Sequence, residues 1–231
     1  MSKKITAIVL AAGKGSRMNS EIPKQYLTLL GKPVLFYSLQ AFEESNVDEI
    51  ILVTGRGEQE YCKKEIIERY QIKKVMHIVE GGKERYHSVW CGLRAAEGAG
   101  YVLIHDGARP LISTSVINEA INKVKETGAC VVGMPVKDTI QFVDDSRTIC
   151  STPERKYTWL AQTPQCFFYD LAVASYNKAI ECKDDKITDD AMAVQKYGNV
   201  CASMILGGYE NIKVTTPEDI AVAECFLKMR K

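Results

Sequence analysis

The sequence predicts an α/β protein: a Rossmann-like, mostly parallel sheet with helices on both faces. Apolar, β-rich runs alternate with helical patterns along the chain, and a glycine-rich loop follows the first apolar run directly. Hydrophobic residues make up 46% of the 231 residues, which is enough for a sizeable core. Such alternation is typical of βαβ units, whose strands run parallel in one sheet. We expect one domain over residues 1–231, because this length suits a single α/β domain.

Short apolar runs rich in β-formers predict the strands. In chain order they are Ile5–Leu10, Glu49–Thr54, Lys74–Val79, Tyr101–His105, Ala129–Met134, Ala202–Leu206 and Asn211–Val214. Ligands of such sheets bind outside the carboxyl ends of the strands. The sequence therefore places a site where the loops after these runs gather.

Segments with helical periodicity lie between the strands. They are Pro33–Glu44, Glu58–Tyr70, Arg85–Glu97, Ser113–Thr127, Asp170–Glu181 and Asp189–Tyr197. A last helix has the clearest start, with Thr216 as the N-cap, Pro217 at the first position, and Glu218 and Asp219 in the first turn.

Residues 137–160 break the alternation because they show no helical period. A turn at Asp144–Ser146 separates two β-rich flanks, Thr139–Val143 and Thr148–Ser151. This pattern predicts a hairpin arm that protrudes from the α/β body. An isolated two-stranded hairpin is marginally stable in water, so we expect the arm to pack on a second copy of the chain.

Charge and cysteine content limit the classes of function. The 30 basic and 29 acidic residues give a net charge of +1, which argues against nucleic-acid binding and requires any phosphate site to use a local cluster of cations. Eight cysteines without CxxC spacing predict reduced thiols and no zinc site. Lys3 and Lys4 before the apolar run resemble a short signal peptide, but Lys14 and Arg17 follow at once. We expect a cytoplasmic protein without a membrane span.

The loop in ITAIVLAAGKGSRM, residues 5–18, fits neither common phosphate-binding pattern. A dinucleotide fingerprint would need a third glycine at Met18, and no Gly-Lys-Ser/Thr triplet provides a Walker loop. Ala11 and Ala12 leave room for a flat base beside the backbone. Gly13 and Gly15 allow successive N–H groups to face an anion.

Two cations follow this loop, Arg17 and Lys24. A loop that only holds a pyrophosphate has no need of such a pair. A loop at which a triphosphate is cleaved does, because negative charge builds on the attacked phosphorus and on the departing pyrophosphate. From spacing alone, solvated surface charges remain the alternative interpretation.

Several motifs in a fixed order extend the pattern over essentially the whole chain. LAAGKGSRM followed by PKQYL (23–27) resembles the signature of sugar and polyol phosphate nucleotidyltransferases. The further motifs are GGKERYHSV (81–89), HDGARP (105–110), PVKDTI (135–140), AQTPQ (161–165), TDDA (188–191) and ENIKVTTPED (210–219). Together they resemble the 2-C-methyl-D-erythritol 4-phosphate cytidylyltransferase family of non-mevalonate isoprenoid synthesis, which has a nucleotide-diphospho-sugar transferase fold.

The resemblance implies a reaction in which a phosphate oxygen of the polyol phosphate attacks the α-phosphorus of CTP in line. It also implies roles for individual residues. Arg17 and Lys24 match the transition-state stabilisers, while Gly13 and Gly15 match the phosphate cradle beside Ala11 and Ala12. The positions around cytosine and ribose are matched by Gly81, Gly82 and Ser88. Lys83 stands where relatives often carry Asp, so whether Lys83 contacts the base is open. The roles of Lys14, Arg85 and Arg109 are open as well.

A second group of residues concerns the metal and the polyol. Asp106 matches a Mg²⁺ ligand at the end of its strand, a place where one carboxylate can complete its shell with water and phosphate oxygens. Arg155 and Lys213 match the residues that orient the polyol phosphate, and the arginine reaches the neighbouring subunit's site in a homodimer. Thr139, Thr188 and Asp189 match positions near the polyol. The alternatives are β-propensity for Thr139 and an N-cap for Thr188.

Two other functions remain open at this stage. A ribitol 5-phosphate cytidylyltransferase would share the loop, the metal and the reaction. A non-catalytic nucleotide-binding module would share only the fold. His77, His87 and His105 are not expected to be catalytic, because the attacking phosphate is already anionic. His105 is expected to orient its neighbour or to pack.

Overall fold

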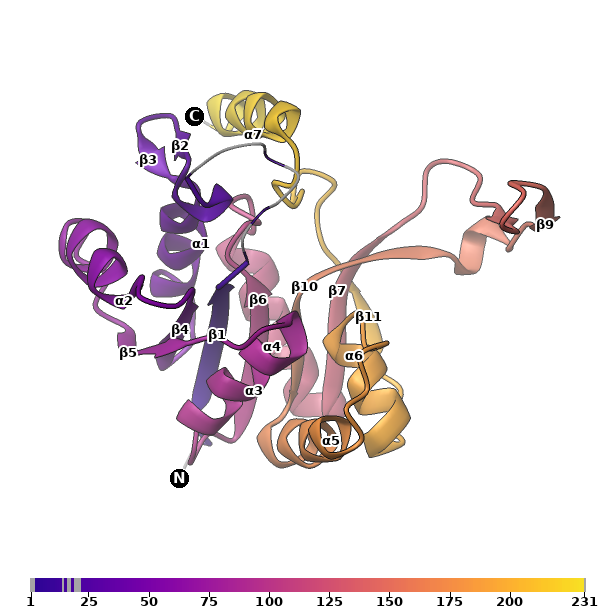
Figure 1. Cartoon of the computed structure of the whole chain (residues 1–231), viewed down its shortest axis with the longest axis horizontal. Coiled ribbons are helices and arrows are strands. Elements are labelled where there is room, and N and C mark those ends of the chain that lie inside the picture. Colours follow the sequence, from indigo (N-terminus) through magenta and orange to yellow (C-terminus); the bar gives the residue numbers. More distant parts are fainter. Residues whose placement is uncertain (1–2, 14, 16–17, 19–21, 231) are drawn as a thin grey trace.

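The computed structural model describes residues 3–13, 15, 18 and 22–230. A seven-stranded sheet in the order β11-β7-β10-β6-β1-β4-β5 forms its centre (Figure 1). The strands are β1 (Ile5–Ala11), β4 (Glu49–Thr54), β5 (Val75–Glu80), β6 (Tyr101–Asp106), β7 (Ala129–Pro135), β10 (Trp159–Phe168) and β11 (Ser203–Leu206). All neighbours are parallel except β10, which runs antiparallel to β6 and β7. The mostly parallel sheet is therefore confirmed.

The predicted strands are correct with two exceptions. Residues 211–214 form no strand, because side chains and one backbone bond hold this segment instead. Asn211 donates from Nδ2 to Gln162 and Thr163, and the N–H of Val214 donates to Ala108. The second exception is β10, the longest strand, which the sequence analysis did not predict.

The helices begin and end within a few residues of the predicted segments. They are α1 (Val34–Glu43), α2 (Gln59–Tyr61) continued by η3 (Cys62–Glu68), α3 (Arg85–Ala95), α4 (Thr114–Thr127), α5 (Tyr169–Glu181), α6 (Asp190–Ala193) continued by η5 (Val194–Gly198), and α7 (Pro217–Met229). α7 starts as expected, with a reciprocal capping box between Thr216 and Asp219 and with Pro217 in the first turn. A short turn η2 (Lys24–Tyr26) and the small pair β2 (Thr28–Leu29) and β3 (Lys32–Pro33) connect β1 to α1.

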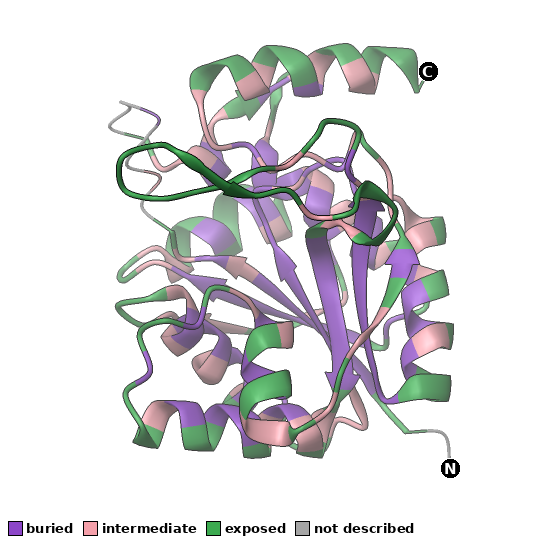
Figure 2. Cartoon of the chain, turned by 90° about the vertical axis from the view of Figure 1, so that its right-hand side faces the viewer, coloured by how far each residue is buried: buried purple, intermediate pink, exposed green. Residues whose placement is uncertain are grey.

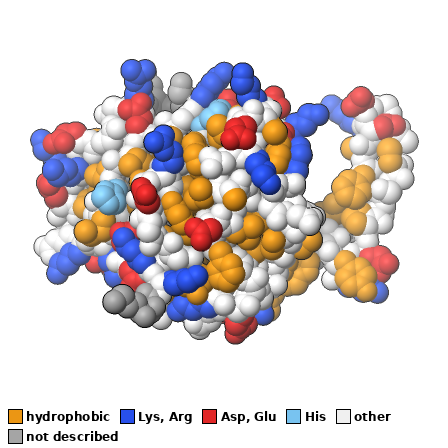
Figure 3. All heavy atoms as spheres, turned by 90° about the horizontal axis from the view of Figure 1, so that it is seen from below, with side chains coloured by type: hydrophobic (Ala, Val, Ile, Leu, Met, Phe, Trp, Pro, Cys, Tyr) orange, Lys and Arg blue, Asp and Glu red, His pale blue; other side chains and the backbone are white. Residues whose placement is uncertain are grey.

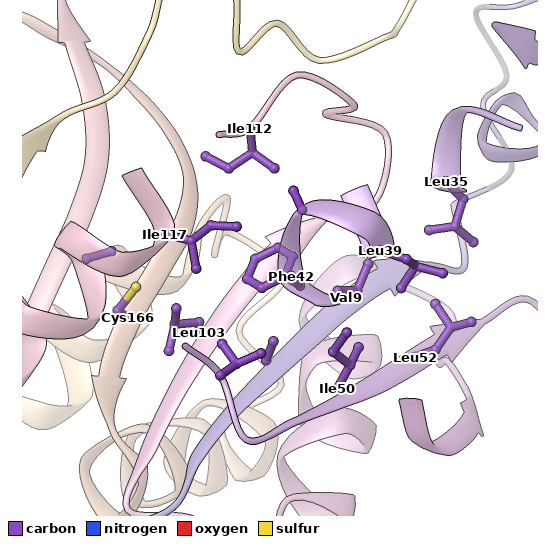
Figure 4. Close-up of a cluster of buried hydrophobic side chains, with 14 of the residues drawn as sticks. Val9, Leu35, Leu39, Phe42, Ile50, Leu52, Leu103, Ile112, Ile117 and Cys166 are labelled. Carbon is purple, nitrogen blue, oxygen red and sulfur yellow. The ribbon is translucent and has the colours of Figure 1, made fainter. Parts of the chain in front are cut away.

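Helices cover both faces of the sheet, as the alternation of strands and helices predicts. One face packs against α1, α4 and the α2–η3 helix, and the other against α3, α5 and the α6–η5 helix. Figure 4 shows Phe42 of α1 between Ile117 of α4 and Val9 of β1 in the first of these layers. A separate small cluster beneath α7 includes Met18 and Val214. The residue that departs from the dinucleotide fingerprint is thus a buried packing residue.

The predicted arm, residues 137–160, is present after β7, and its last two residues, Trp159 and Leu160, begin β10. Its strands β8 (Phe142–Val143) and β9 (Ile149–Ser151) pair antiparallel, and Oδ1 of Asp144 accepts hydrogen bonds from the N–H groups of Ser146 and Thr148 in the turn. The arm extends away from the body and is exposed along its length (Figures 1 and 2). Its apolar side chains are exposed too (Figure 3): Phe142, Val143, Ile149, Tyr157 and Leu160.

Candidate active site

A pocket of about 1080 Å³ opens at the carboxyl ends of β1, β4, β5 and β6. This is the edge at which parallel α/β sheets bind ligands. Nine of the predicted site residues line it: Ala11, Ala12, Gly13, Lys24, Gly81, Gly82, Ser88, Asp106 and Lys213. They come from five separate motifs, so the fold brings together what the sequence distributes over two hundred positions.

The loop after β1 forms one wall of the pocket. Gly15 has a positive φ of 62°, and a Cβ at this position would lie 3.1 Å from Cγ of Lys24. Gly15 thus supplies the left-handed backbone that the tight turn needs and leaves room for the lysine stem. The predicted residue Arg17 and the unassigned Lys14 lie outside the described residues.

Two residues of the PKQYL motif fix the loop and its lysine. Gln25 is buried and donates from Nε2 to the carbonyl oxygen of Ala11 at 2.6 Å, a role that sequence analysis missed. Nζ of Lys24 donates to the carbonyl oxygen of Val214 at 2.9 Å. The lysine thus lines the pocket and connects η2 to the segment before α7.

The glycines of the GGKE loop make close contacts that exclude a side chain. A Cβ on Gly81 would lie 2.6 Å from Cβ of Ala12, and one on Gly82 would lie 2.3 Å from Cβ of His87. The hydroxyl of Ser88 accepts a hydrogen bond from the N–H of Gly82 at 3.1 Å. Packing alone therefore requires both glycines, and it leaves their backbone at the pocket surface. Lys83 also lines the pocket.

Asp106 lies at the floor of the pocket between two cations. Its Oδ2 is 2.7 Å from Nζ of Lys213, and its Oδ1 accepts from Nε of Arg85 at 3.2 Å. Burial alone would raise the pKa of Asp106, but the charges of Arg85 and Lys213 outweigh it and hold this pKa well below its ordinary value. The carboxylate is therefore ionised throughout the neutral pH range.

Arg85, whose role the sequence left open, joins two carboxylates. Its Nη1 and Nη2 donate to Oδ1 and Oδ2 of Asp190 at 2.8 Å each, while its Nε faces Asp106. Asp190 is completely buried and also accepts from the hydroxyl of Tyr176 at 2.5 Å. Burial would lower the pKa of Arg85, yet Asp190 and Asp106 raise it well above the ordinary value.

The TDDA motif contacts the site through Asp190, which the sequence analysis did not select. Thr188 and Asp189 do not line the described pocket, and Asp189, not Thr188, is the N-cap of α6, accepting from the N–H of Met192 at 2.8 Å. The N-cap alternative for Thr188 is therefore wrong. Asp190 was missed, because its partner Arg85 is 105 residues away in the chain.

His105 and Arg109 do not line the described pocket and make hydrogen bonds within the protein. His105 is fully buried, and its Nε2 lies 3.3 Å from the carbonyl oxygen of Arg109, which can only accept, so Nε2 carries the proton. Nδ1 then accepts from the hydroxyl of Thr163 at 3.1 Å. Burial lowers the pKa of His105 to about 4. Arg109 donates from Nη1 to the carbonyl oxygen of Asn211 at 2.8 Å, which anchors the segment that carries Lys213.

The remaining predicted pair lies on the arm. Nη2 of Arg155 donates to the hydroxyl of Thr139 at 2.9 Å, and both residues are exposed. Neither lines the pocket of the same chain. One copy of the chain, over its described residues, therefore does not place Arg155 and Thr139 beside Asp106 and Lys213.

Comparison with known proteins shows which family the chain belongs to. The model of the IspD family, 2-C-methyl-D-erythritol 4-phosphate cytidylyltransferase, matches residues 5–229. The chain belongs to this cytidylyltransferase family. It is 53% identical to the family enzyme of Lachnospira eligens, over 96% of this chain and 99% of that one, and 49% identical to that of Lachnoclostridium phytofermentans, over 98% and 97%.

The cytidylyltransferase fold is also found among solved structures. The 4-diphosphocytidyl-2C-methyl-D-erythritol synthase from Anaerococcus prevotii superposes with a TM-score of 0.86 at 34% identity, covering 98% of this chain and 96% of that one. The cytidylyltransferase of Thermus thermophilus gives a TM-score of 0.77 at 28% identity, covering 96% and 98%. The chain is thus a nucleotidyltransferase. Among the described residues, no helix is long and apolar enough to cross a membrane.

Proposed function

We propose that this enzyme transfers the cytidylyl group of CTP to 2-C-methyl-D-erythritol 4-phosphate, giving 4-diphosphocytidyl-2-C-methyl-D-erythritol and pyrophosphate for non-mevalonate isoprenoid synthesis. The observation that carries the proposal is the convergence of Lys24, Lys213 and Asp106 on one pocket that glycine loops border. Relatives over nearly the whole chain carry the same name and support the choice of substrates.

The reaction requires little from the protein beyond position and charge. A phosphate oxygen of the polyol phosphate forms a bond to the α-phosphorus, and the bond from that phosphorus to the bridging oxygen of the β-phosphate breaks. The electron pair leaves with pyrophosphate. Lys24, at the mouth of the pocket, is suited to stabilise the charge that develops on the transferred group. Arg17, which follows the same loop in the sequence, is assigned the same role.

We assign the metal site to Asp106, with Mg²⁺ as the ion. One carboxylate is a sufficient protein ligand where nucleotide phosphates and water complete the shell. Each oxygen of Asp106 receives one donor, from Arg85 or from Lys213, so lone pairs remain for a cation. When bound, Mg²⁺ would neutralise part of the triphosphate charge. Lys213, beside the same carboxylate, is suited to orient the phosphate of the polyol.

The proposal includes a homodimer in which the arm completes the neighbouring site. Support comes from the exposed apolar side chains of the arm and from Arg155 and Thr139, which share a hydrogen bond far from their own pocket. The Thr188 and Asp189 side chains remain assigned to the polyol end of the site on resemblance alone. A cytoplasmic location is also proposed, and the eight free cysteines are consistent with a reducing compartment.

The experiment that tests this function is a pyrophosphate-release assay with purified protein, CTP and Mg²⁺. 2-C-methyl-D-erythritol 4-phosphate and ribitol 5-phosphate are compared side by side, and the nucleotide product is identified by mass spectrometry. We expect release with the methylerythritol compound, at a kcat/KM at least tenfold above that with ribitol phosphate. Faster turnover of ribitol phosphate would reassign the substrate, and no release with either would refute the enzymatic function.

A further inference from the structure

We infer that Asp190 is a positioning residue for the reaction: acting through Arg85, it holds the carboxylate of Asp106 in the orientation that leaves it open to a divalent cation. The inference rests on the proposed function, because it concerns the metal site assigned there. Asp190 lines no part of the pocket itself, so any effect on the reaction has to pass through another residue.

The first step is the geometry of the guanidinium group. Its two terminal nitrogens are both occupied by the oxygens of Asp190, at 2.8 Å each, which fixes the plane of the group. Nε on the remaining edge then has one direction available, and it points to Oδ1 of Asp106 at 3.2 Å. Because the guanidinium group is planar, fixing its two terminal nitrogens on one carboxylate also fixes the direction of its Nε–H bond.

The second step is how Asp190 is itself held. It is the first residue of α6, whose N-cap is Asp189, and the next backbone N–H, that of Ala191, donates to Oε1 of Gln165 on β10 at 2.7 Å. The hydroxyl of Tyr176 donates to Oδ1 of Asp190 from α5. Asp190 is fully buried, so its carboxylate has protein partners on all sides and no alternative orientation in water.

The third step concerns charge. Arg85 and Lys213 together balance the two carboxylates Asp106 and Asp190. Without the charge of Asp190, the Arg85 guanidinium would turn its terminal nitrogens toward Asp106 and bind both of its oxygens. A cation would then have to compete with Arg85 for both oxygens of Asp106, whereas in the parent Arg85 occupies only one of them. Partners that orient metal ligands commonly change metal affinity 10- to 100-fold when they are removed.

The test measures cation binding directly, with Mn²⁺ as a spectroscopic substitute for Mg²⁺. Electron paramagnetic resonance reports free Mn²⁺ in a titration of the enzyme–CTP complex. We expect Asp190→Asn to weaken Mn²⁺ binding about tenfold or more. The matched control is Asp184→Asn. Like Asp190, Asp184 accepts from one basic side chain and one tyrosine, here Lys196 and Tyr197, but it lies outside the pocket. This control is expected to bind Mn²⁺ as the parent does.

Two further variants separate positioning from folding. Tyr176→Phe removes one hydrogen bond to Asp190 and keeps every charge. It therefore tests the same contacts even if Asp190→Asn does not fold. A two- to fivefold loss of Mn²⁺ affinity is expected. In the double variant Asp190→Asn/Arg85→Gln no released guanidinium competes for Asp106. Its Mn²⁺ affinity is expected to be higher than that of Asp190→Asn alone, a non-additive result that a merely structural role does not produce.

Specific results would overturn the inference. These are an unchanged Mn²⁺ affinity in folded Asp190→Asn or in Tyr176→Phe, an equal loss in Asp184→Asn, or a double variant that is weaker than Asp190→Asn. A parent enzyme that binds no Mn²⁺ with CTP would also overturn it, together with the metal assignment. Failure of the proposed function is recognised separately, because the parent's release of pyrophosphate does not depend on any variant.

Discussion

The ammonium group of Lys213 lies 2.7 Å from Oδ2 of Asp106, and the carbonyl oxygen of the next residue, Val214, accepts a hydrogen bond from Lys24. Two consecutive residues therefore connect the floor of the pocket to the loop after β1. The segment that carries them has no regular secondary structure, and it is held by Arg109, Asn211 and the N–H of Val214. The positions of Lys213 and Lys24 are therefore coupled through this segment.

Removal of the Lys213 charge is expected to lower kcat/KM for the polyol phosphate more than for CTP. Lys213→Met should lower kcat/KM for 2-C-methyl-D-erythritol 4-phosphate by about 100- to 1000-fold, the range found when a donor to developing charge is lost. Asp106 keeps Arg85 as a partner, so the fold should be retained. Steady-state kinetics with each substrate varied in turn measures the effect.

The control for this variant is Lys196→Met. Lys196 pairs with Asp184 at 2.6 Å, a distance similar to that of the Lys213 pair, but outside the pocket. Its kcat/KM should stay within about twofold of the parent value, as surface ion pairs contribute little. A similar loss in both variants would contradict the role of Lys213.

The second prediction concerns the turn at Gly15, which we expect to position Lys24. Gly15→Ala introduces a Cβ 3.1 Å from the Lys24 side chain and forces alanine into a left-handed conformation. Gly31→Ala introduces the same strain at a φ of 82°, with no atom within 4 Å of the new Cβ. Both variants should lose about 1 kcal/mol of unfolding free energy in urea titrations. Only Gly15→Ala should also lose kcat, by tenfold or more, because it displaces Lys24. Equal kcat in the two variants would show that the turn does not position the lysine.

Hydrophobic periodicity was sufficient to predict the sheet and its helical layers, because six of its seven strands are apolar runs. It could not predict β10, whose sequence WLAQTPQCFF is interrupted by polar residues and a proline. Those polar side chains are buried because they make hydrogen bonds near the site. Thr163 bonds to His105 and to the N–H of Asp106, and Gln165 bonds to the backbone at the start of α6. The register shift between Ala161 and Gln165 accommodates the proline within the strand.

The predicted pocket residues were largely those that the structure brings together, because they lie in strand-end loops where the fold places ligands. The features that the sequence analysis missed depend on contacts between residues far apart in the chain. The sequence of the TDDA motif does not distinguish the roles of Asp189 and Asp190. Only the fold shows that Asp190 binds Arg85. Likewise, residues 211–214 have a strand-like composition, but tertiary hydrogen bonds from Asn211 and Val214 fix them as a loop.

His105 predicts a pH dependence of stability. Its pKa is lowered from 6.5 to about 4 in the folded protein, chiefly by burial, so the unfolded chain binds a proton there at a pH where the folded chain does not. The contribution of His105 to stability is therefore fully present above pH 6.5 and is lost as the pH falls through this interval. The decrease due to His105 should be about 3 kcal/mol by pH 4, where the folded ring also becomes protonated.

Urea titrations between pH 7 and pH 4.5 measure this slope. His105→Gln should flatten it, although the variant is less stable at every pH because it loses the contacts to Thr163 and Arg109. His77→Gln, at an exposed histidine, is the matched control and should retain the parent slope. An unchanged slope in His105→Gln would mean that other groups, such as the acidic side chains, govern acid destabilisation.

The last prediction concerns the arm. If Arg155 completes the site of the neighbouring copy, Arg155→Ala should raise KM for the polyol phosphate more than for CTP. Lys24→Ala should lower kcat in the copy that carries it. When the two impaired variants are refolded together at equal amounts, half of the dimers are mixed, and each mixed dimer has one site with both Lys24 and Arg155. About a quarter of all sites should then be active by random assortment. Activity that stays at the level of the separate variants, with mixed dimers verified by mass spectrometry, would mean that Arg155 does not act across the interface.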